Sequence, residues 1–255
     1  MPRVLVVIPT HQEADNIAQV IERVLSAVPD GHVLVVDDAS TDGTPDIAER
    51  IDDGRGCITV MRRTTKDGLG NAYRVGFRWG LENEYDILCE IDADLSHDPA
   101  VLPELISPVA LGAQLAIGSR YVPGGAIVGW PYKRLALSRW GNRYVALMLG
   151  LAINDATAGF RAFQASIISA CDLLETRSDG YMFQVETTYR LVRAGARIVE
   201  IPIVFTERQK GHSKMKSSIV KEALWLVTLW GMRDLLTRRR VHATNFRNLD
   251  ASATR

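Results

Sequence analysis

Residues 85–99 read YDILCEIDADLSHDP and combine a structural signal with a chemical one. The apolar run 85–91 has the length and composition of a buried strand. Asp92, Asp94 and Asp98 crowd the stretch that follows it. Asp98 can cap a helix that begins at Pro99, because proline fits the first helical position. We therefore expect a strand, an acidic loop and a helix through Leu105.

The same alternation extends on both sides of this stretch, from residue 3 to about residue 119. We expect strands at 3–9, 32–38, 57–62, 85–91 and 114–120, and helices at about 15–27, 45–51, 68–83 and 98–105. Fully apolar strands that alternate with helices indicate a mostly parallel, Rossmann-like sheet with helices on both faces. The predicted fold class is α/β, and ligands of such sheets bind beyond the carboxyl ends of the strands.

Composition limits the class of protein. The chain has 255 residues and 47% apolar content, enough for one sizeable core. The 30 basic and 30 acidic side chains cancel, which gives no support for nucleic-acid binding. Cys57, Cys89 and Cys171 show no CxxC spacing, which favours reduced thiols. No signal-peptide core or apolar run of about 18 residues is present, so we expect a cytoplasmic protein.

The pattern changes after residue 120. A Gly/Pro-rich loop precedes an expected helix at 133–153, which combines arginines with leucine, Trp140 and Tyr144. A helix at 183–195, a strand at 197–205, a basic loop at 206–216 and an amphipathic segment at 217–236 follow, then a polar tail at 241–255 that we expect to be flexible. We expect one domain over 1–240, with halves at 1–120 and 121–240.

The spacing of Asp92 and Asp94 suits a metal. Alternate residues on extended backbone project to the same side, so both carboxylates can reach one cation. Oxygen ligands suit Mg²⁺ or Mn²⁺, and Mg²⁺ commonly bridges substrate phosphates. The structural alternative is a solvated turn, which we accept for Asp98 as a helix cap.

Two further groups of residues fall at strand ends or in loops. Asp37 and Asp38 either form a helix-capping turn or accept hydrogen bonds from a base or a ribose hydroxyl. The cations Arg120, Arg134, Arg208 and Lys214 are either solvated surface charges or the groups that hold phosphates. The motifs of hydrolase triads, zinc peptidases and P-loop kinases are absent.

Eight stretches occur together in the order and spacing of a known family. They are VVIPTHQEADNI, VVDDASTDGT, GLGNAYRVGF, EIDADLSHDP, GSRYVPGG, GWPYKRLALSRWGN, DATAGFRAF and ERQKGHSKM. Over residues 3 to 240 the chain resembles the polyprenol-phosphate (dolichyl-phosphate) mannose synthases, which are family 2 glycosyltransferases. The resemblance implies a GT-A fold with acceptor-side helices. It also implies metal-dependent, inverting transfer of mannose from GDP-mannose to a polyprenyl phosphate.

The resemblance also implies roles for individual residues. The expected nucleotide-sugar contacts are Pro9, His11, Glu13, Val36, Asp38, Asp92, Ala93, Asp94, Arg208 and Lys214. Asp92, Asp94 and Ser96 are the expected metal site, Arg120, Arg134 and Ser138 the expected contacts of the acceptor phosphate, and Asp94 and Arg120 the expected catalytic residues. The chain departs from the family at His11 and Gln12, where Tyr and Asn are usual, and at Ser96, where some relatives have Gln.

A lipid acceptor would explain the composition of the half of the chain at 121–240. The segments 133–151 and 217–240 combine leucine, Trp or Tyr with flanking basic residues, as interfacial helices do, although each is also compatible with a core helix. We expect a peripheral enzyme on the cytoplasmic face of a membrane, with or without a separate membrane-anchor protein. The alternatives are transfer from UDP-glucose or UDP-N-acetylglucosamine to the same acceptor, or a non-catalytic nucleotide-binding subunit of a membrane complex.

Overall fold

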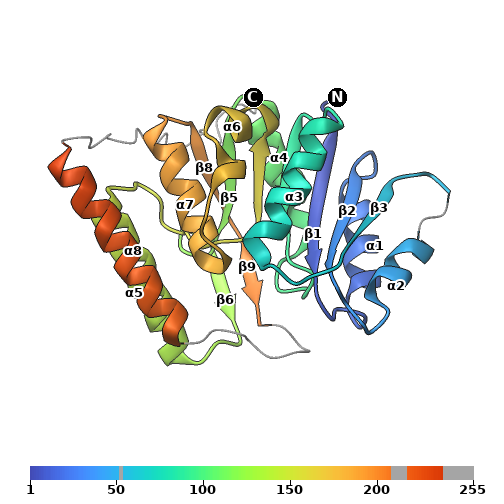
Figure 1. Cartoon of the computed structure of the whole chain (residues 1–255), viewed down its shortest axis with the longest axis horizontal. Coiled ribbons are helices and arrows are strands. Elements are labelled where there is room, and N and C mark those ends of the chain that lie inside the picture. The colour runs from blue at the N-terminus through green and yellow to red at the C-terminus, as the bar shows by residue number, and fades with distance from the viewer. Residues whose placement is uncertain (52–53, 208–216, 238–255) are drawn as a thin grey trace, which may run out of the picture.

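A seven-stranded central sheet organises the molecule, which we describe from a computed structural model (Figure 1). The structure describes residues 1–51, 54–207 and 217–237, without the side chains of 217–222. The strand order is β3-β2-β1-β4-β7-β5-β8. The strands are β1 (Val4–Thr10), β2 (His32–Asp38), β3 (Ile58–Arg63), β4 (Ile87–Glu90), β5 (Leu115–Ser119), β7 (Arg161–Gln164) and β8 (Ile198–Pro202).

Helices cover both faces of this sheet, as the apolar strands predict. They are α1 (Ile17–Ala27), α2 (Thr44–Ile51), α3 (Leu69–Glu82), α4 (Leu102–Ala110), α5 (Tyr132–Leu149), α6 (Ala165–Ala170), α7 (Gly180–Arg193) and α8 (Ser217–Leu236), with short 3-10 turns η1 (Pro99–Val101) and η2 (Leu173–Glu175). Strand β1 shows why its sequence is apolar throughout. Leu5 and Val7 pack into the core under α3, whereas Val6 and Ile8 pack into the core under α1. The predicted α/β class and the doubly covered sheet are confirmed.

One strand in the middle of the sheet was not predicted. Strand β7 comes from the second half of the chain and runs antiparallel between β4 and β5, with Glu90 opposite Arg161. Its four residues, RAFQ, are too short and too polar to read as a strand of a buried sheet. Because β7 lies between two strands of the first half, the two halves of the sequence share one sheet.

The predicted strand at 197–205 is wrong in its extent. It is two strands, β8 in the central sheet and β9 (Val204–Thr206), which pairs with β6 (Ala126–Val128) in a separate two-stranded ribbon. Ile203 stands between them and donates its backbone N–H to Ser119. The predicted helix at 133–153 ends at Leu149, because Gly150 adopts a left-handed conformation with φ 63°.

The loops at one edge of the sheet contain strained backbone. Gln12 after β1, Ala39 after β2 and Leu95 after β4 have φ values of 60°, 55° and 61°. Residues other than glycine seldom adopt such φ angles, and the residues that do are concentrated at functional sites. All three lie at the carboxyl edge, where ligands of α/β sheets bind.

Candidate active site

The acidic loop after β4 holds its two carboxylates differently. Asp94 is 8% exposed, and its Oδ1 accepts the backbone N–H of Ser96 at 3.0 Å. The Asp92 side chain is 34% exposed, and its Oδ1 lies 3.4 Å from the buried hydroxyl of Tyr73. Ser96 is 3% exposed, so its side chain presents almost no surface to a ligand. Asp98 accepts the Ala100 N–H, so the predicted cap is confirmed. The predicted helix through Leu105 is instead the short turn η1 followed by α4, which continues to Ala110.

These residues fit a divalent cation in part. Among the described residues, no three His, Cys, Asp or Glu side chains form a set that could hold a metal ion. The exposed carboxylate of Asp92 and the adjacent Asp94 suit a cation that completes its shell with water and phosphate oxygens, as Mg²⁺ commonly does.

An aromatic layer joins the acidic loop to the neighbouring pocket. The His97 ring lies 5.2 Å from the rings of both Phe160 and Phe205, and its Nδ1 is 3.8 Å from Asp92 Oδ2. Burial lowers the pKa of His97 to about 4, so the ring is neutral at pH 7. Phe205 also packs edge-on against Trp130 at 5.4 Å. One aromatic side chain thus contacts both the acidic loop and the pocket wall.

The expected nucleotide contacts gather at the ends of β1 and β2. His11 Nδ1 is 2.8 Å from the backbone oxygen of Asp38, which joins the two loops. The Asp38 carboxylate is 7% exposed and pairs with Arg63. Burial raises the pKa of Asp38, against the lowering effect of Arg63. Pro9 and Glu13 are partly exposed nearby.

Three neighbouring residues have structural roles: two side chains are buried in the core and the third caps a turn. Val36 is fully buried in the core under α3, so we correct its expected contact with a nucleoside: it offers no surface to a ligand. Ala93 is 4% exposed and packs into the core on the other face. Asp37 accepts hydrogen bonds from Thr10 and Ser40, which identifies it as the turn-capping member of the Asp37-Asp38 pair.

Arg120 at the end of β5 is held by an acid that the sequence reasoning did not single out. Its Nε and Nη2 donate to the two oxygens of Asp155 at 2.7 Å each, and its backbone N–H donates to Asp155 at 3.0 Å. Nη2 also reaches Thr157 at 2.9 Å. Burial lowers the pKa of Arg120, but the charge and hydrogen bonds of Asp155 outweigh it and the net pKa is raised.

The loop that carries Asp155 is itself fixed at both ends. Glu200 on β8 accepts the backbone N–H groups of Asn154 and Asp155 at 2.9 and 3.0 Å. Arg161, which is fully buried, donates to the backbone oxygens of Ala156 and Ala158 at 2.8 and 2.7 Å. In the sequence, this arrangement is visible only as the stretch DATAGFR (155–161), in which four small residues and Phe160 separate the acid from the arginine.

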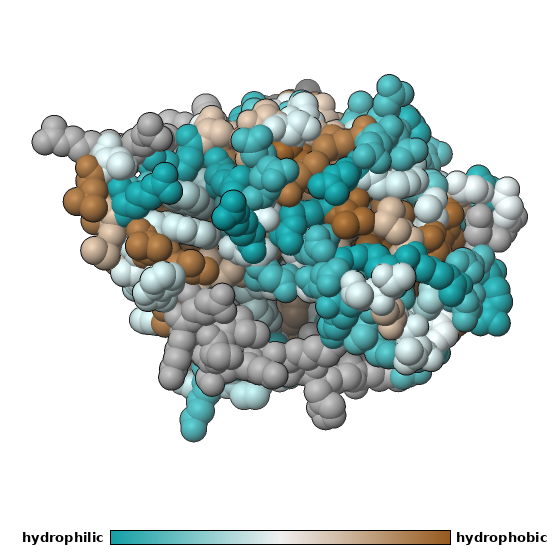
Figure 2. Space-filling view, viewed as in Figure 1, coloured by the Kyte–Doolittle hydropathy of each residue, from teal (hydrophilic) through white to brown (hydrophobic). Residues whose placement is uncertain are grey.

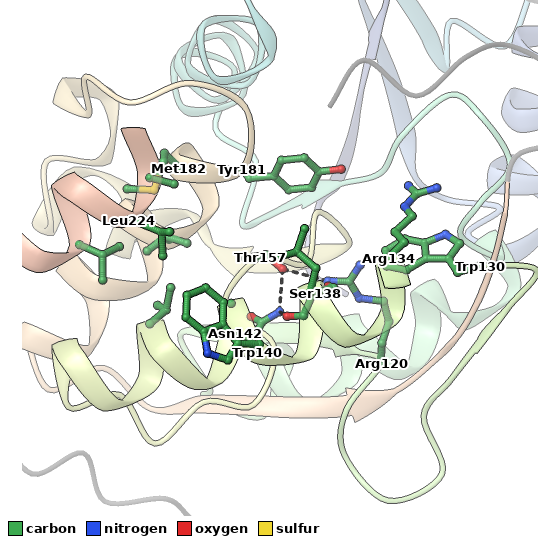
Figure 3. A pocket seen from close by; sticks show the side chains of 16 residues that line it. Arg120, Trp130, Arg134, Ser138, Trp140, Asn142, Thr157, Tyr181, Met182 and Leu224 are labelled. Carbon is green, nitrogen blue, oxygen red and sulfur yellow. Dashed lines mark hydrogen bonds between the residues drawn. The ribbon is translucent and has the colours of Figure 1, made fainter. Parts of the chain in front are cut away.

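Arg120 lies at one end of a pocket formed by α5, α7 and α8. Arg134 and Ser138 on α5 line the same end, with Trp130 beside them (Figure 3). The Arg134 guanidinium stacks on Trp130 at 4.0 Å, and its Nη1 donates to Glu207 at 2.7 Å. Ser138 Oγ accepts the hydroxyl of Tyr121 at 2.7 Å. The structure therefore brings together all three residues expected at the acceptor phosphate.

The opposite end of the pocket is apolar. Figure 3 shows Met182 and Leu224 there, away from the arginines. The apolar lining residues are Leu137, Trp140, Val145, Met182, Val185, Ala223, Leu224 and Val227. With arginines at one end and apolar side chains along the rest, the open pocket suits a ligand with one anionic end and a hydrocarbon body. The remaining predicted cations, Arg208 and Lys214, lie outside the described residues.

Comparison with known proteins gives the family of the chain. Residues 5–171 match the model of the family described as "Glycosyl transferase family 2". The chain is 47% identical over 241 residues to the polyprenol monophosphomannose synthase of Mycolicibacterium smegmatis, covering 93% of this chain and 90% of the relative. It is 51% identical over 230 residues to the undecaprenyl-phosphate mannosyltransferase of Micrococcus luteus, covering 90% and 94%.

A solved structure supports the fold. Glucosyl-3-phosphoglycerate synthase from Mycobacterium tuberculosis, in complex with Mn²⁺ and UDP-glucose, superposes with a TM-score of 0.62 at 20% identity, covering 93% of this chain and 79% of that one. The sheet and its covering helices are therefore those of a GT-A glycosyltransferase. The chain belongs to glycosyl transferase family 2, with the two mannosyltransferases as homologues.

Proposed function

We propose that this enzyme transfers mannose from GDP-mannose to the phosphate of a polyprenyl phosphate, with inversion. The pocket is the observation that carries the proposal: Arg120, Arg134 and Ser138 at one end suit a phosphate, and the apolar lining suits an isoprenoid chain. The acidic loop adjoins this pocket through Phe205. The names of the two relatives, a polyprenol monophosphomannose synthase and an undecaprenyl-phosphate mannosyltransferase, support the same acceptor and sugar.

The proposed reaction requires positioning more than acid–base chemistry. A phosphate monoester has a second pKa near 6, so at neutral pH its oxygen is already a nucleophile and no protein base is needed. Arg120 and Arg134 hold that phosphate and screen its charge from the diphosphate of the donor. We therefore assign Arg120 to catalysis through its contact with the reacting phosphate.

We assign most donor contacts to the half of the chain at 1–120 and most acceptor contacts to the half at 121–240. The exceptions are Arg120, which contacts the acceptor, and Arg208 and Lys214, which contact the donor. Asp92 and Asp94 would hold Mg²⁺ or Mn²⁺, which stabilises the leaving diphosphate when it is bound. Ser96 supports this loop through its backbone, which bonds Asp94 and Thr206. Pro9, His11, Glu13 and Asp38 would contact the nucleoside, Ala93 would line the diphosphate through its backbone, and Arg208 and Lys214 would bind phosphates.

The metal assignment has its own test. We expect Asp94→Ala to abolish transfer and to weaken Mn²⁺ binding measured by electron paramagnetic resonance, while the circular dichroism spectrum stays unchanged. Normal turnover by a folded, metal-replete Asp94→Ala enzyme would remove this residue from the mechanism.

The lipid acceptor implies contact with a membrane. Within the part of the chain that the structure describes, no helix has the length and hydropathy needed to span a bilayer. Helix α8 nevertheless exposes an apolar stripe of Trp225, Leu229, Met232 and Leu236, and Figure 2 shows brown surface on the side of the molecule where α8 lies. We propose that this stripe docks the enzyme peripherally on the cytoplasmic face of a membrane, with or without a separate anchor protein.

One assay tests the donor, the acceptor and the metal together. The enzyme is incubated with polyprenyl phosphate, Mg²⁺ and radiolabelled GDP-mannose, UDP-glucose or UDP-N-acetylglucosamine, and solvent-extractable label is counted with and without a chelator. We expect label from GDP-mannose alone, and none with the chelator. Label from a UDP-sugar would identify a different donor, and binding of a donor without any transfer would identify a non-catalytic subunit.

A further inference from the structure

Each of the two arginines that line the pocket is paired with a carboxylate, but one pair is buried and the other is accessible to water. The Arg120 and Asp155 side chains are 6% and 0% exposed, and three hydrogen bonds join the two residues. The Arg134 and Glu207 side chains are 20% and 37% exposed, and one hydrogen bond of 2.7 Å joins them. The first pair is a fixed part of the interior, whereas water reaches the second.

The backbone brings Glu207 to this position. Its N–H donates to the oxygen of Val128 at 2.9 Å, which continues the pairing of β6 with β9. Gly129, with φ 90°, allows the close approach, because a Cβ there would lie 3.0 Å from Cβ of Glu207. Arg134 is held from the other side by its stacking on Trp130. The Glu207 carboxylate therefore pairs with a guanidinium that Trp130 already holds in position.

The Glu207 carboxylate takes up the Nη1 donor of Arg134, which is one of the donors available to a phosphate. Carboxylate and phosphate oxygens bind the guanidinium fork with the same geometry, so they compete for it. We propose that Glu207 is a displaceable counter-ion: the acceptor phosphate removes it from Arg134 on binding, while Asp155 stays on Arg120. This inference rests on the proposed function, because it takes the arginine end of the pocket as the phosphate site.

The exchange has a measurable consequence. If the acceptor must break the Arg134–Glu207 pair, the free energy of that pair is subtracted from the free energy of acceptor binding. Exposed ion pairs are weak, so this cost is small. Removing the carboxylate should therefore lower the KM for the acceptor about two- to fivefold, equivalent to about 0.4–1 kcal/mol. The KM for the sugar nucleotide should not change, because Glu207 pairs with a residue of the acceptor pocket.

The experiment compares three variants of the full chain with a detergent-soluble, short-chain polyprenyl phosphate as acceptor. Glu207→Gln keeps the size of the side chain and removes its charge. Glu49→Gln is the control, since Glu49 pairs with Arg62 of β3 in another solvent-accessible ion pair, whose side chains are 48% and 47% exposed. Arg134→Gln removes the guanidinium itself. The KM values for acceptor and donor are measured separately, after thermal melting has shown that each variant is folded.

The outcomes separate the inference from the proposed function. A lower acceptor KM in Glu207→Gln, with Glu49→Gln unchanged and Arg134→Gln raised, supports the displacement. An unchanged or raised acceptor KM in Glu207→Gln, with Arg134→Gln raised, overturns it and leaves the phosphate site in place. An unchanged acceptor KM in Arg134→Gln overturns both, because the phosphate would then not bind there.

Discussion

Replacing Asp155 by asparagine tests the buried half of the acceptor site. The side chain is fully buried, and it accepts the Nε and Nη2 hydrogens and the backbone N–H of Arg120. Asparagine has nearly the same shape, but it offers one acceptor oxygen and turns an NH₂ group toward these donors. Arg120 would keep its positive charge in the interior without a full partner.

The expected loss of stability follows from this geometry. Removing one partner of a buried ion pair costs roughly 3–5 kcal/mol, because the other charge remains buried. Since the asparagine oxygen retains part of the hydrogen bonding, we expect the lower end, about 3 kcal/mol. For a chain of this size the melting temperature should then fall by about 6–12 °C, taking roughly 2–4 °C per kcal/mol.

Urea unfolding followed by circular dichroism measures this loss, with Glu207→Gln as the control. That variant breaks an exposed pair, so its free energy of unfolding should change by no more than about 1 kcal/mol. We also expect Asp155→Asn to raise the acceptor KM, because Arg120 is no longer oriented. A loss of stability below about 1 kcal/mol, equal to that of the control, would refute the view that Asp155 fixes Arg120.

Two other predictions follow from the same structure. Burial raises the pKa of Glu90 to about 8, against the lowering effects of Arg161 and Gln184, so the folded protein holds this proton to a higher pH than the unfolded chain does. With a chelator present, the free energy of unfolding should therefore fall as pH rises from 6.5 to 8, by at most about 1.4 kcal/mol per pH unit, and Glu90→Gln should flatten this slope in urea titrations. An equal slope in both proteins would assign the titration to another group. Replacing Trp225 and Leu229 by glutamate should reduce co-sedimentation with anionic lipid vesicles several-fold and leave the melting temperature nearly unchanged, since both side chains are exposed; undiminished sedimentation would exclude α8 as the docking face.

The proposed donor side of the site could be predicted from the sequence because its signals are local. The expected strands of the first half are mostly apolar, and the acids at 37, 38, 92 and 94 lie at or just beyond the carboxyl ends of two of them. In a sheet with both faces covered, that pattern alone puts the acids at the carboxyl edge. The cap at Asp98 was equally local, since aspartate is a favoured N-cap residue and proline suits the position that follows it.

The acceptor side depended on contacts between distant residues. Nothing near Arg120 in the sequence shows that Asp155, 35 positions later, takes its guanidinium, or that Glu200 fixes the loop of Asp155. Strand β7 was missed for the same reason: four residues form a strand there only because β4 and β5 lie on either side with open hydrogen-bonding edges. Periodicity and local motifs were therefore enough to predict the fold class and the acids at the carboxyl edge of the sheet, because the sequence of each helix or strand shows which of its faces is buried. Only the tertiary structure decided which charges meet in the interior, because an ion pair depends on positions in space that sequence spacing does not encode.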